Sequence, residues 1–315
     1  MAPKIAIIGG GSAYAPGLIK AFLEKPKVFA GANIVLMDIA KQELEIVSSL
    51  AQKMTKCADV DVNVQATTTQ KEAIEGADYI LSTFRQGGFE ARHIDESIPL
   101  IYNVIGQETI GPGGFFFAMR TLPVIYSILQ DIQTYAPHAT LINYTNPTQI
   151  VAEAVTHFSS VPCISICDQT KADQQKILHA LAMPNAKVFL ESVGFNHATW
   201  STYFTINGED GLTVMRRHMG KVLQREDVDH RVKRQFRLAD EYGRLPNSYL
   251  QYYYFREETL AEAHSKKKTR AEEILDILPS YYHHFKQQML LDEPFLTHVR
   301  GGSVFGDMAV EIISA

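Results

Sequence analysis

A cysteine and a histidine at separate places in the chain could together bind a transition metal. Cys167 ends the apolar run PCISIC at 162–167, and His197 lies in the segment GFNHATW at 194–200. A thiolate and an imidazole both bind divalent metals, and two protein ligands leave coordination positions open for a substrate. The sequence holds no C-x-x-C or H-E-x-x-H motif, and a lone cysteine is more often a small core residue. Spacing alone therefore leaves metal binding and simple burial both open.

A glycine-rich segment near the N-terminus could bind a dinucleotide. Gly9, Gly11 and Ser12 lie between a short apolar run and a predicted helix, where a tight turn lets a pyrophosphate approach backbone N–H groups. Asp38 ends the next apolar run, where a carboxylate commonly accepts a hydrogen bond from a ribose 2′-hydroxyl. Because that carboxylate would repel a 2′-phosphate, NAD is favoured over NADP. Tyr14 replaces the last glycine of the G-x-G-x-x-G pattern, so a tight turn without a ligand is the alternative.

Polar side chains follow the predicted fourth and fifth strands, at the edge where open parallel sheets bind ligands. Arg85 and Arg92 could each bind an anion through two parallel hydrogen bonds, although solvated arginines are the commoner case. The amide of Asn146 either caps the next helix or binds substrate hydroxyls. The segment IGQETIGPGG at 105–114 is too rich in glycine for a regular element, which is typical of a functional loop.

Alternating strands and helices must position these groups. Short apolar runs lie at 4–9, 33–38, 60–65, 78–83, 140–144 and 162–167, separated by helical stretches. This order predicts an α/β fold with a Rossmann-like doubly wound parallel sheet. Strands at 188–193 and 200–207 among helices predict an α+β arrangement for the second half. We therefore expect a NAD-binding domain at 1–168 and a substrate- and metal-binding domain at 169–315.

Composition excludes several classes of function. The 315 residues are 46% hydrophobic and 21% charged, which is typical of globular proteins. A net charge of −5 argues against a nucleic-acid binder. No window offers the ~18 uninterrupted apolar residues that a membrane span needs, and the first residues lack the order of a signal peptide. With three cysteines, an odd number, we expect a cytoplasmic protein with reduced thiols and no membrane partner.

Taken in order, these motifs resemble glycoside hydrolase family 4, the NAD- and Mn²⁺-dependent family that includes 6-phospho-α- and 6-phospho-β-glucosidases. The matching stretches are IGGGSAYAP at 8–16, FRQGGFEAR at 84–92, DESIPLIYNVIGQETIGPGG at 95–114, NYTNPTQIVAEAV at 143–155, ICDQ at 166–169, GFNHATW at 194–200, PNSYLQYYYF at 246–255, RAEEIL at 270–275 and RGGSVFGDMA at 300–309. Each stretch is weak alone, but the series covers the chain from end to end. The resemblance implies the lactate/malate dehydrogenase-like superfold and a homodimer or homotetramer.

The resemblance also implies roles for individual residues. It assigns cofactor, metal and substrate contacts as follows: NAD⁺ at Gly9, Gly11, Ser12 and Asp38; Mn²⁺ or another divalent metal at Cys167 and His197; the phosphorylated sugar at Arg92, Asn146 and Arg270. Tyr249 resembles the catalytic tyrosine, with Tyr252 or Tyr253 as alternatives. Asp168 stands where 6-phospho-α-glucosidases carry an acid, whereas β-specific members usually have Asn, so the α-anomer is slightly favoured.

The implied reaction hydrolyses a phosphorylated disaccharide or glycoside. NAD⁺ takes a hydride from sugar carbon 3, which makes the proton on carbon 2 acidic. Tyr249, as tyrosinate, would remove that proton, and Asp168 would protonate the aglycone as it leaves carbon 1. Water then adds and the hydride returns, so the reaction needs no pair of flanking carboxylates and has no net redox change.

Two other interpretations stay open. A 2-hydroxy acid dehydrogenase of the lactate/malate type shares the fold and could use His197 as its base, but it leaves Cys167 and the tyrosine cluster unexplained. Members of the family usually continue well past the RGG segment, whereas this sequence ends at Ala315. A truncated or shortened chain makes an inactive NAD-binding remnant the third interpretation. The stretch ICDQT also lacks the proline that often follows the Cys-Asp pair in phosphoglucosidases, which keeps the substrate open.

Overall fold

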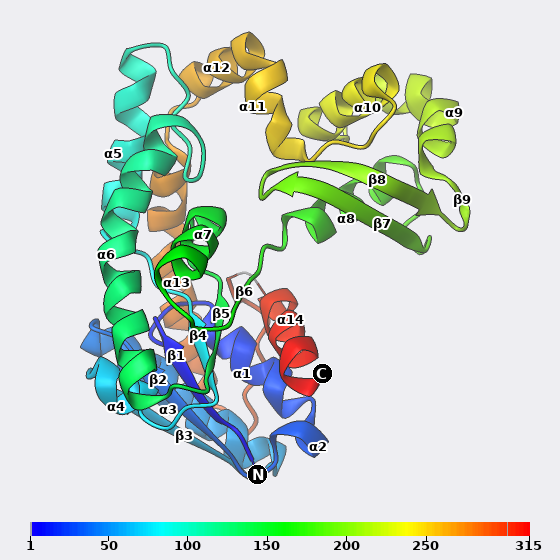
Figure 1. The fold of residues 1–315 in the computed structure, drawn as a ribbon. Helices are drawn as coiled ribbons and strands as arrows, with labels where there is room; N and C mark the ends of the chain where they lie inside the picture. The colour runs from blue at the N-terminus through cyan, green and yellow to red at the C-terminus, as the bar shows by residue number, and fades with distance from the viewer. Residues whose placement is uncertain (1, 301) are drawn as a thin grey trace. The chain divides into compact units, whose positions relative to one another are not determined.

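The apolar runs of the first half form one parallel sheet in the computed structural model, which describes residues 2–300 and 302–315 (Figure 1). The strands are β1 (Lys4–Ile8), β2 (Ala32–Met37), β3 (Val62–Thr67), β4 (Tyr79–Ser82), β5 (Thr140–Asn143) and β6 (Cys163–Ser165). Their order is β3-β2-β1-β4-β5-β6, and every neighbouring pair is parallel. The order reverses at β1, as in doubly wound folds. The predicted fold class is confirmed.

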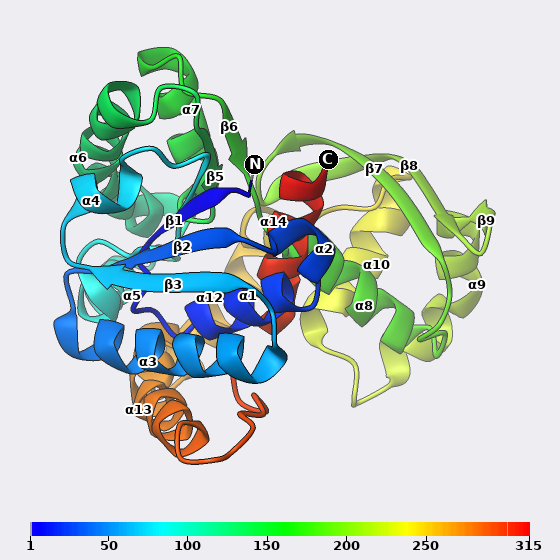
Figure 2. The same cartoon turned by 90° about the horizontal axis from the view of Figure 1, so that it is seen from below.

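Helices cover both faces of this sheet (Figure 2). One face carries α1 (Ala15–Leu23), α3 (Lys41–Ala58), α13 (Arg270–Gln288) and α14 (Gly302–Ser314), with α2 (Pro26–Phe29) after α1; the other carries α4 (Gln70–Ile74), α6 (Gly111–Tyr135) and α7 (Thr148–Phe158). Helix α5 (Gly88–Ile101) packs against α6 and α13. Successive residues of β1 point to opposite faces, so Ile7 joins one core and Ile8 the other. Burial on both faces explains why the strands read as continuous apolar runs.

The chain divides into two units: residues up to Ile166 together with Lys267–Ala315 form the first, and Cys167–Lys266 the second. The first break lies close to the predicted one at 168. The structure differs from the prediction in placing residues 267–315 with the first unit. The reason is apolar packing, because Phe285 of α13 is fully buried in the core around β1, and α14 packs on α1. Gly306 of α14 permits a close approach, since a Cβ there would lie 2.5 Å from that of Ala21.

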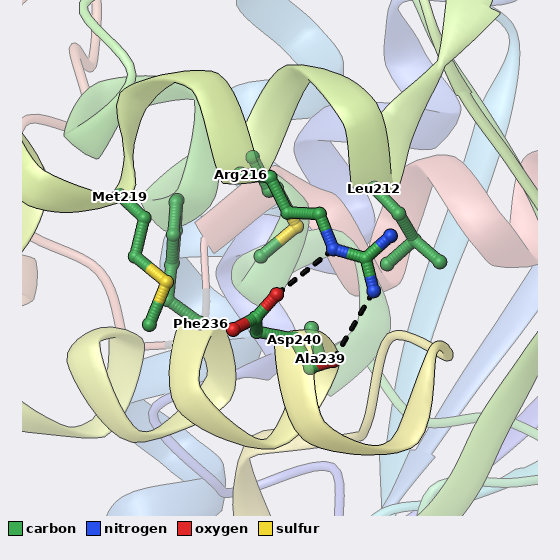
Figure 3. Close-up of a pocket in the computed structure, with 7 residues that line it drawn as sticks. Leu212, Arg216, Met219, Phe236, Ala239 and Asp240 are labelled. Carbon is green, nitrogen blue, oxygen red and sulfur yellow. Dashed lines mark hydrogen bonds and ion pairs between the residues drawn. The ribbon is translucent and has the colours of Figure 1, made fainter.

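The second unit has the predicted α+β character. Its antiparallel sheet and helices are α8 (Gln169–Ala180), β7 (Val188–Phe195), β8 (Ala198–Ile206), β9 (Glu209–Asp210), α9 (Gly211–Gln224), α10 (His230–Tyr242), the 3₁₀ helix η1 (Ser248–Leu250), α11 (Gln251–Tyr254) and α12 (Arg256–Ser265). Helices α9 and α10 share an apolar core that includes Phe236. Arg216 Nε of α9 and the carboxylate of Asp240 on α10 form an ion pair 2.8 Å long beside this core (Figure 3).

Helix α6 is the one described helix long and apolar enough, by length and composition, to cross a membrane. Ile125, Leu129 and Ile132 on this helix are buried in the core beside the sheet. Core helices pass the same test, so α6 is weak evidence for a membrane span.

Candidate functional site

The second unit brings Cys167 and His197 together. Cys167 lies just before α8 and His197 in the turn between β7 and β8, and Cys167 Sγ is 3.4 Å from His197 Nε2. His197 is buried and has a left-handed φ of 65°, a conformation that is uncommon for residues other than glycine, although asparagine, aspartate and histidine adopt it more often than the rest. Backbone strain of this kind is concentrated at functional sites. The hairpin thus holds the imidazole against the thiol.

The chemistry of this pair suits a divalent metal. Burial raises the pKa of the Cys167 thiol, and a hydrogen bond from Asn196 only partly offsets it. A thiolate there therefore needs a nearby positive charge, which a metal ion supplies. The described residues contain no group of three or more His, Cys, Asp or Glu side chains able to hold a metal. Cys167 and His197 are the two candidate ligands that the structure brings together.

Tyr249 lies directly on the same imidazole. Its ring and that of His197 are stacked, with centroids 3.9 Å apart and planes inclined by 15°. The ring of Tyr252 lies edge-on to that of Tyr249, with centroids 5.8 Å apart, while Tyr253 is largely exposed. Of the three tyrosines considered from the sequence, Tyr249 is the one stacked on the candidate metal ligand.

Asp168 lies between Cys167 and helix α8, at the position that begins the helix. Burial raises the pKa of its carboxyl group. A raised pKa keeps a larger share of the carboxyl protonated near neutral pH, as a general acid requires. The sequence suggested this residue only through the family motif, and the structure adds a partly desolvated environment.

In the first unit, the glycine-rich turn forms as predicted after β1. Gly9 has a φ of 91°, and a Cβ there would lie 2.7 Å from the backbone nitrogen of Phe84, so only glycine fits. Gly11 N donates a 2.9 Å hydrogen bond to Asp38 Oδ2, which links the turn to the end of β2. Ser12 Oγ is buried and has no hydrogen-bond partner among the described residues. An unpartnered hydroxyl beside the start of α1 fits a pyrophosphate oxygen of NAD.

Tyr282 contacts this turn, and nothing in the sequence pattern indicated that contact. It comes from α13, and its hydroxyl donates to Gly11 O at 2.9 Å. Burial, reinforced by Glu43 and Asp38, raises its pKa, so the hydroxyl stays protonated and able to donate. No local pattern could have placed a residue so distant in the sequence at this turn.

A cluster of arginines around Glu108 occupies the edge of the same sheet. Glu108 pairs with Arg85, with Arg92 Nη1 at 2.7 Å, and with Asn146 Nδ2 at 3.3 Å. Burial opposes ionisation of Glu108, but Arg85 and Arg92 outweigh it and lower its pKa to about 2. Arg300 stacks on Phe89 at 4.4 Å, and burial together with Arg85 and Arg92 lowers its pKa.

The guanidinium and carboxylate groups of this cluster sum to a net positive charge. Arg92 Nε donates to Glu96 Oε1 at 2.7 Å, so the buried carboxylate of Glu96 and the partly buried carboxylate of Glu108 lie among the guanidinium groups of Arg85, Arg92 and Arg300. An anion such as a phosphate would complete the balance. Sequence reasoning singled out Arg92 and Asn146 but missed Glu108, which holds both, although it lies in the glycine-rich loop already marked as functional.

Asn146 and Arg270 behave differently in this structure. Asn146 Oδ1 accepts from Thr148 Oγ1 at 2.8 Å, so its amide both supports the start of α7 and reaches Glu108. Arg270, at the start of α13, is exposed and pairs with Glu273 at 2.8 Å. The structure thus brings Asn146 to the arginine cluster, whereas the recorded contact of Arg270 points elsewhere.

Comparisons with known proteins identify the family of this chain. The family model described as "Family 4 glycosyl hydrolase" matches residues 4–183, and the model of the "Family 4 glycosyl hydrolase C-terminal domain" matches residues 192–315. A probable 6-phospho-beta-glucosidase of Bacillus subtilis is 31% identical, over 99% of this chain and 72% of its own length. A maltose-6′-phosphate glucosidase of Clostridium acetobutylicum is also 31% identical, over 87% of this chain and 65% of its own length.

Solved structures show the same similarity. A 6-phospho-alpha-glucosidase from gut microorganisms, in complex with NAD and Mn²⁺, has a TM-score of 0.84 at 26% identity, over 99% of this chain and 74% of that chain. The 6-phospho-beta glucosidase from Thermotoga maritima, with manganese, NAD⁺ and glucose-6-phosphate, has a TM-score of 0.80 at 26% identity, over 98% and 72%. A structure named for the α-anomer and one named for the β-anomer therefore both match this chain at 26% identity.

Proposed function

This chain belongs to family 4 of the glycosyl hydrolases, and on that premise we propose that it hydrolyses 6-phosphorylated glycosides with NAD⁺ and Mn²⁺ as cofactors. The observation that carries the proposal is the triple of Cys167, His197 and Tyr249. A thiol 3.4 Å from an imidazole, with a phenol ring stacked 3.9 Å from that imidazole, suits a metal site with an adjacent base. A lactate-type dehydrogenase has no use for the thiol or the tyrosine.

The second unit would hold the metal and move the protons. Cys167 and His197 would bind Mn²⁺, and Gly9, Gly11, Ser12 and Asp38 of the first unit would bind NAD⁺. When bound, the two supply Lewis-acid polarisation of sugar oxygens and reversible hydride transfer at carbon 3.

Tyr249 would accept the carbon 2 proton at its hydroxyl oxygen, and that oxygen must first be deprotonated because a free tyrosine titrates near ~10. Asp168 would donate its proton to the oxygen of the aglycone as the bond from that oxygen to carbon 1 breaks. Its raised pKa supports this role. The acidic residue at this position favours 6-phospho-α-glucosides over the β-anomers.

The first unit would bind the phosphorylated sugar. Arg92 and Asn146 are held by one partly buried carboxylate, that of Glu108, which fixes both side chains before a substrate arrives. Preorganised donors avoid the cost of ordering during binding. We include Arg270 among the substrate contacts on the family motif alone, because its recorded partner is Glu273.

We also infer a cytoplasmic homodimer or homotetramer. The three cysteines are free in the structure, which suits a reducing compartment. Helix α5 exposes a stripe of isoleucines, Ile94, Ile98 and Ile101, which are 52%, 49% and 76% exposed. A contiguous apolar stripe on a surface helix is typical of an interface. Light scattering of the wild type and of Ile98→Lys tests this, and a monomeric wild type would contradict it.

Hydrolysis of p-nitrophenyl α- and β-glucoside 6-phosphate tests the activity. Each substrate is assayed with and without NAD⁺ and Mn²⁺ under reducing conditions. We expect release of p-nitrophenol only when both cofactors are present, faster from the α-anomer, with no steady accumulation of NADH. Accumulating NADH would instead support a dehydrogenase, and NAD⁺ binding without turnover would support an inactive remnant.

A further inference from the structure

The carboxylate of Asp173 is a buried acceptor of several hydrogen bonds in the second unit. It lies on α8 and is 5% exposed. Its Oδ1 accepts from Gln169 Nε2 at 2.7 Å, and its Oδ2 accepts from Ser248 N at 2.9 Å and Gln235 Nε2 at 3.2 Å. A buried carboxylate is tolerated because these donors replace its water. Neither the family motifs nor the proposed mechanism uses this residue.

Two of the three partners of Asp173, Gln169 and Ser248, are the immediate neighbours of residues proposed to carry the chemistry. Gln169 follows Asp168, and Ser248 precedes Tyr249. Gln169 Nε2 also donates to Ser248 Oγ at 3.0 Å, so the two segments are joined directly as well as through Asp173.

Hydrogen bonds to β8 and α10 also hold the segment that leads into the short helix carrying Tyr249. Asn247 N donates to Thr199 O at 2.9 Å, and Asn247 Oδ1 accepts from Tyr249 N at 3.0 Å. Gln235 Nε2 donates to Pro246 O at 2.9 Å. Since Asp173 and Gln235 are both buried, the path of residues 246–249 is set by hydrogen bonds that solvent does not weaken.

We propose that Asp173 is a positioning residue: through Ser248 it fixes the ring of Tyr249 on His197, and through Gln169 it fixes the turn that carries Asp168. The inference rests on the proposed function for the roles of Tyr249 and Asp168. The arrangement itself is independent of that function, so it can be tested separately.

Asparagine at this position is a sharp probe of the hydrogen bonds. The carboxylate accepts from the backbone N–H of Ser248, from two glutamine amides and from the Ser248 hydroxyl. If the amide oxygen of Asp173→Asn stays on Ser248 N, its amide nitrogen replaces the oxygen that accepts from Gln169, so that bond is lost as it stands and the negative charge is removed. The volume hardly changes, so the variant tests hydrogen bonding and charge, and packing stays the same. Asp240→Asn, in an exposed ion pair of the same unit, is the matched control.

The first readout is the position of the Tyr249 ring, which needs no activity. The full-length protein carries 3-fluorotyrosine, and the Tyr249→Phe variant assigns the fluorine resonance. Spectra are recorded without Mn²⁺, whose unpaired electrons broaden nearby signals. We expect Asp173→Asn to shift or broaden the Tyr249 resonance while the resonances of Tyr144 and Tyr282, in the first unit, stay in place. An unmoved Tyr249 resonance in the folded variant would overturn the proposal.

The second readout is kinetic. We expect kcat to fall at least tenfold in Asp173→Asn with KM within about twofold, because the proposed sugar contacts lie elsewhere. The deuterium isotope effect at sugar carbon 2 should rise, since proton removal becomes slower relative to other steps. A merely smaller active fraction would lower kcat but leave the isotope effect unchanged, and that result would overturn the positioning role.

Two further outcomes are separable. If the wild type hydrolyses neither phosphoglycoside, the proposed function fails, and the fluorine spectra still decide whether Asp173 fixes Tyr249. If Asp173→Asn loses the resonances of its whole second unit, Gln169→Met replaces it. That variant removes the bonds from Gln169 to Asp173 and Ser248 at a partly exposed site, and the same Tyr249 shift, smaller in size, is expected.

Discussion

The imidazole of His197 lies flat against the phenol ring of Tyr249, with the ring centroids 3.9 Å apart. The Nε2 atom of the same imidazole lies 3.4 Å from Cys167 Sγ. One histidine therefore joins a candidate metal ligand to a candidate base. A positive charge bound at Nε2 would also favour the ionised form of the stacked phenol, which is the form that a base requires.

Removing either candidate ligand should abolish Mn²⁺-dependent hydrolysis. We expect Cys167→Ser and His197→Asn to lose more than ~100-fold in activity, since even indirect contacts of metal sites matter by 10–100-fold. Asparagine is chosen because it tolerates the left-handed φ of residue 197. NAD⁺ affinity, measured by fluorescence titration, should not change. Cys163→Ser is the control, and full activity in both ligand variants would refute the metal assignment.

Replacing Tyr249 by phenylalanine should stop proton removal at carbon 2. General bases contribute roughly 10²–10⁴-fold, so a loss of that size is expected in both hydrolysis and exchange of the carbon 2 hydrogen with deuterated solvent. The exchange is followed by NMR of the sugar product. Tyr253→Phe serves as the control because that side chain is 60% exposed. Wild-type exchange in Tyr249→Phe would move the role to Tyr252.

The ion pairs of Glu108 with Arg85 and Arg92 should make the first unit sensitive to acid. The pKa of Glu108 falls from 4.5 to about 2 on folding, so the ionised carboxylate stabilises the fold above pH 4.5 and loses this effect as the pH falls toward 2. The full effect is on the order of 3 kcal/mol. Urea unfolding from pH 6 to pH 3 should show a weaker pH dependence for Glu108→Gln than for the wild type.

A control for that measurement is Glu273→Gln, which removes an exposed ion pair with Arg270. Exposed pairs contribute little, so its pH dependence should follow the wild type. Equal slopes for Glu108→Gln and the wild type would contradict the coupling between Glu108 and the arginines.

Alanine at Gly9 should remove both stability and NAD⁺ binding. The left-handed φ of 91° costs an alanine roughly 1–2 kcal/mol, and the contact of its Cβ with Phe84 N at 2.7 Å adds to this cost. Gly76→Ala is a matched control with a φ of 66° and open space around its Cβ. Thermal unfolding should separate the two variants, and NAD⁺ affinity should fall only for Gly9→Ala. Equal losses would show that backbone strain alone is responsible.

The sequence predicts the elements of the sheet well because local patterns encode them. Ile5 and Ile7 belong to a continuous apolar run, and Gly9 ends it with a residue that the turn demands. The motifs of the second unit also indicated Cys167, His197 and Tyr249. Spacing alone did not decide between metal binding and simple burial for Cys167 and His197, and only the family resemblance favoured metal binding.

Residues that act through distant partners could not be predicted in this way. Glu108 and Asp173 look like ordinary acidic residues until the fold shows which donors face them. The position of α13 is another case, because its helical pattern says nothing about which core receives Phe285. Such choices depend on long-range packing, which no local window contains.

The packing of α13 and α14 on the first sheet has a consequence for synthesis. A ribosome must complete residues 167–266 before it can deliver Phe285 to the core around β1 or Tyr282 to the turn at Gly11. Until then α1 and α3 cover only part of that face of the nascent sheet, and the exposed apolar remainder is the kind of surface that promotes aggregation. Folding of the first unit is thus a non-local event with a long loop closed late, which makes it slow for its size. Codon usage and chaperone access over residues 167–288 would therefore govern the yield of active protein more than those of the first strands.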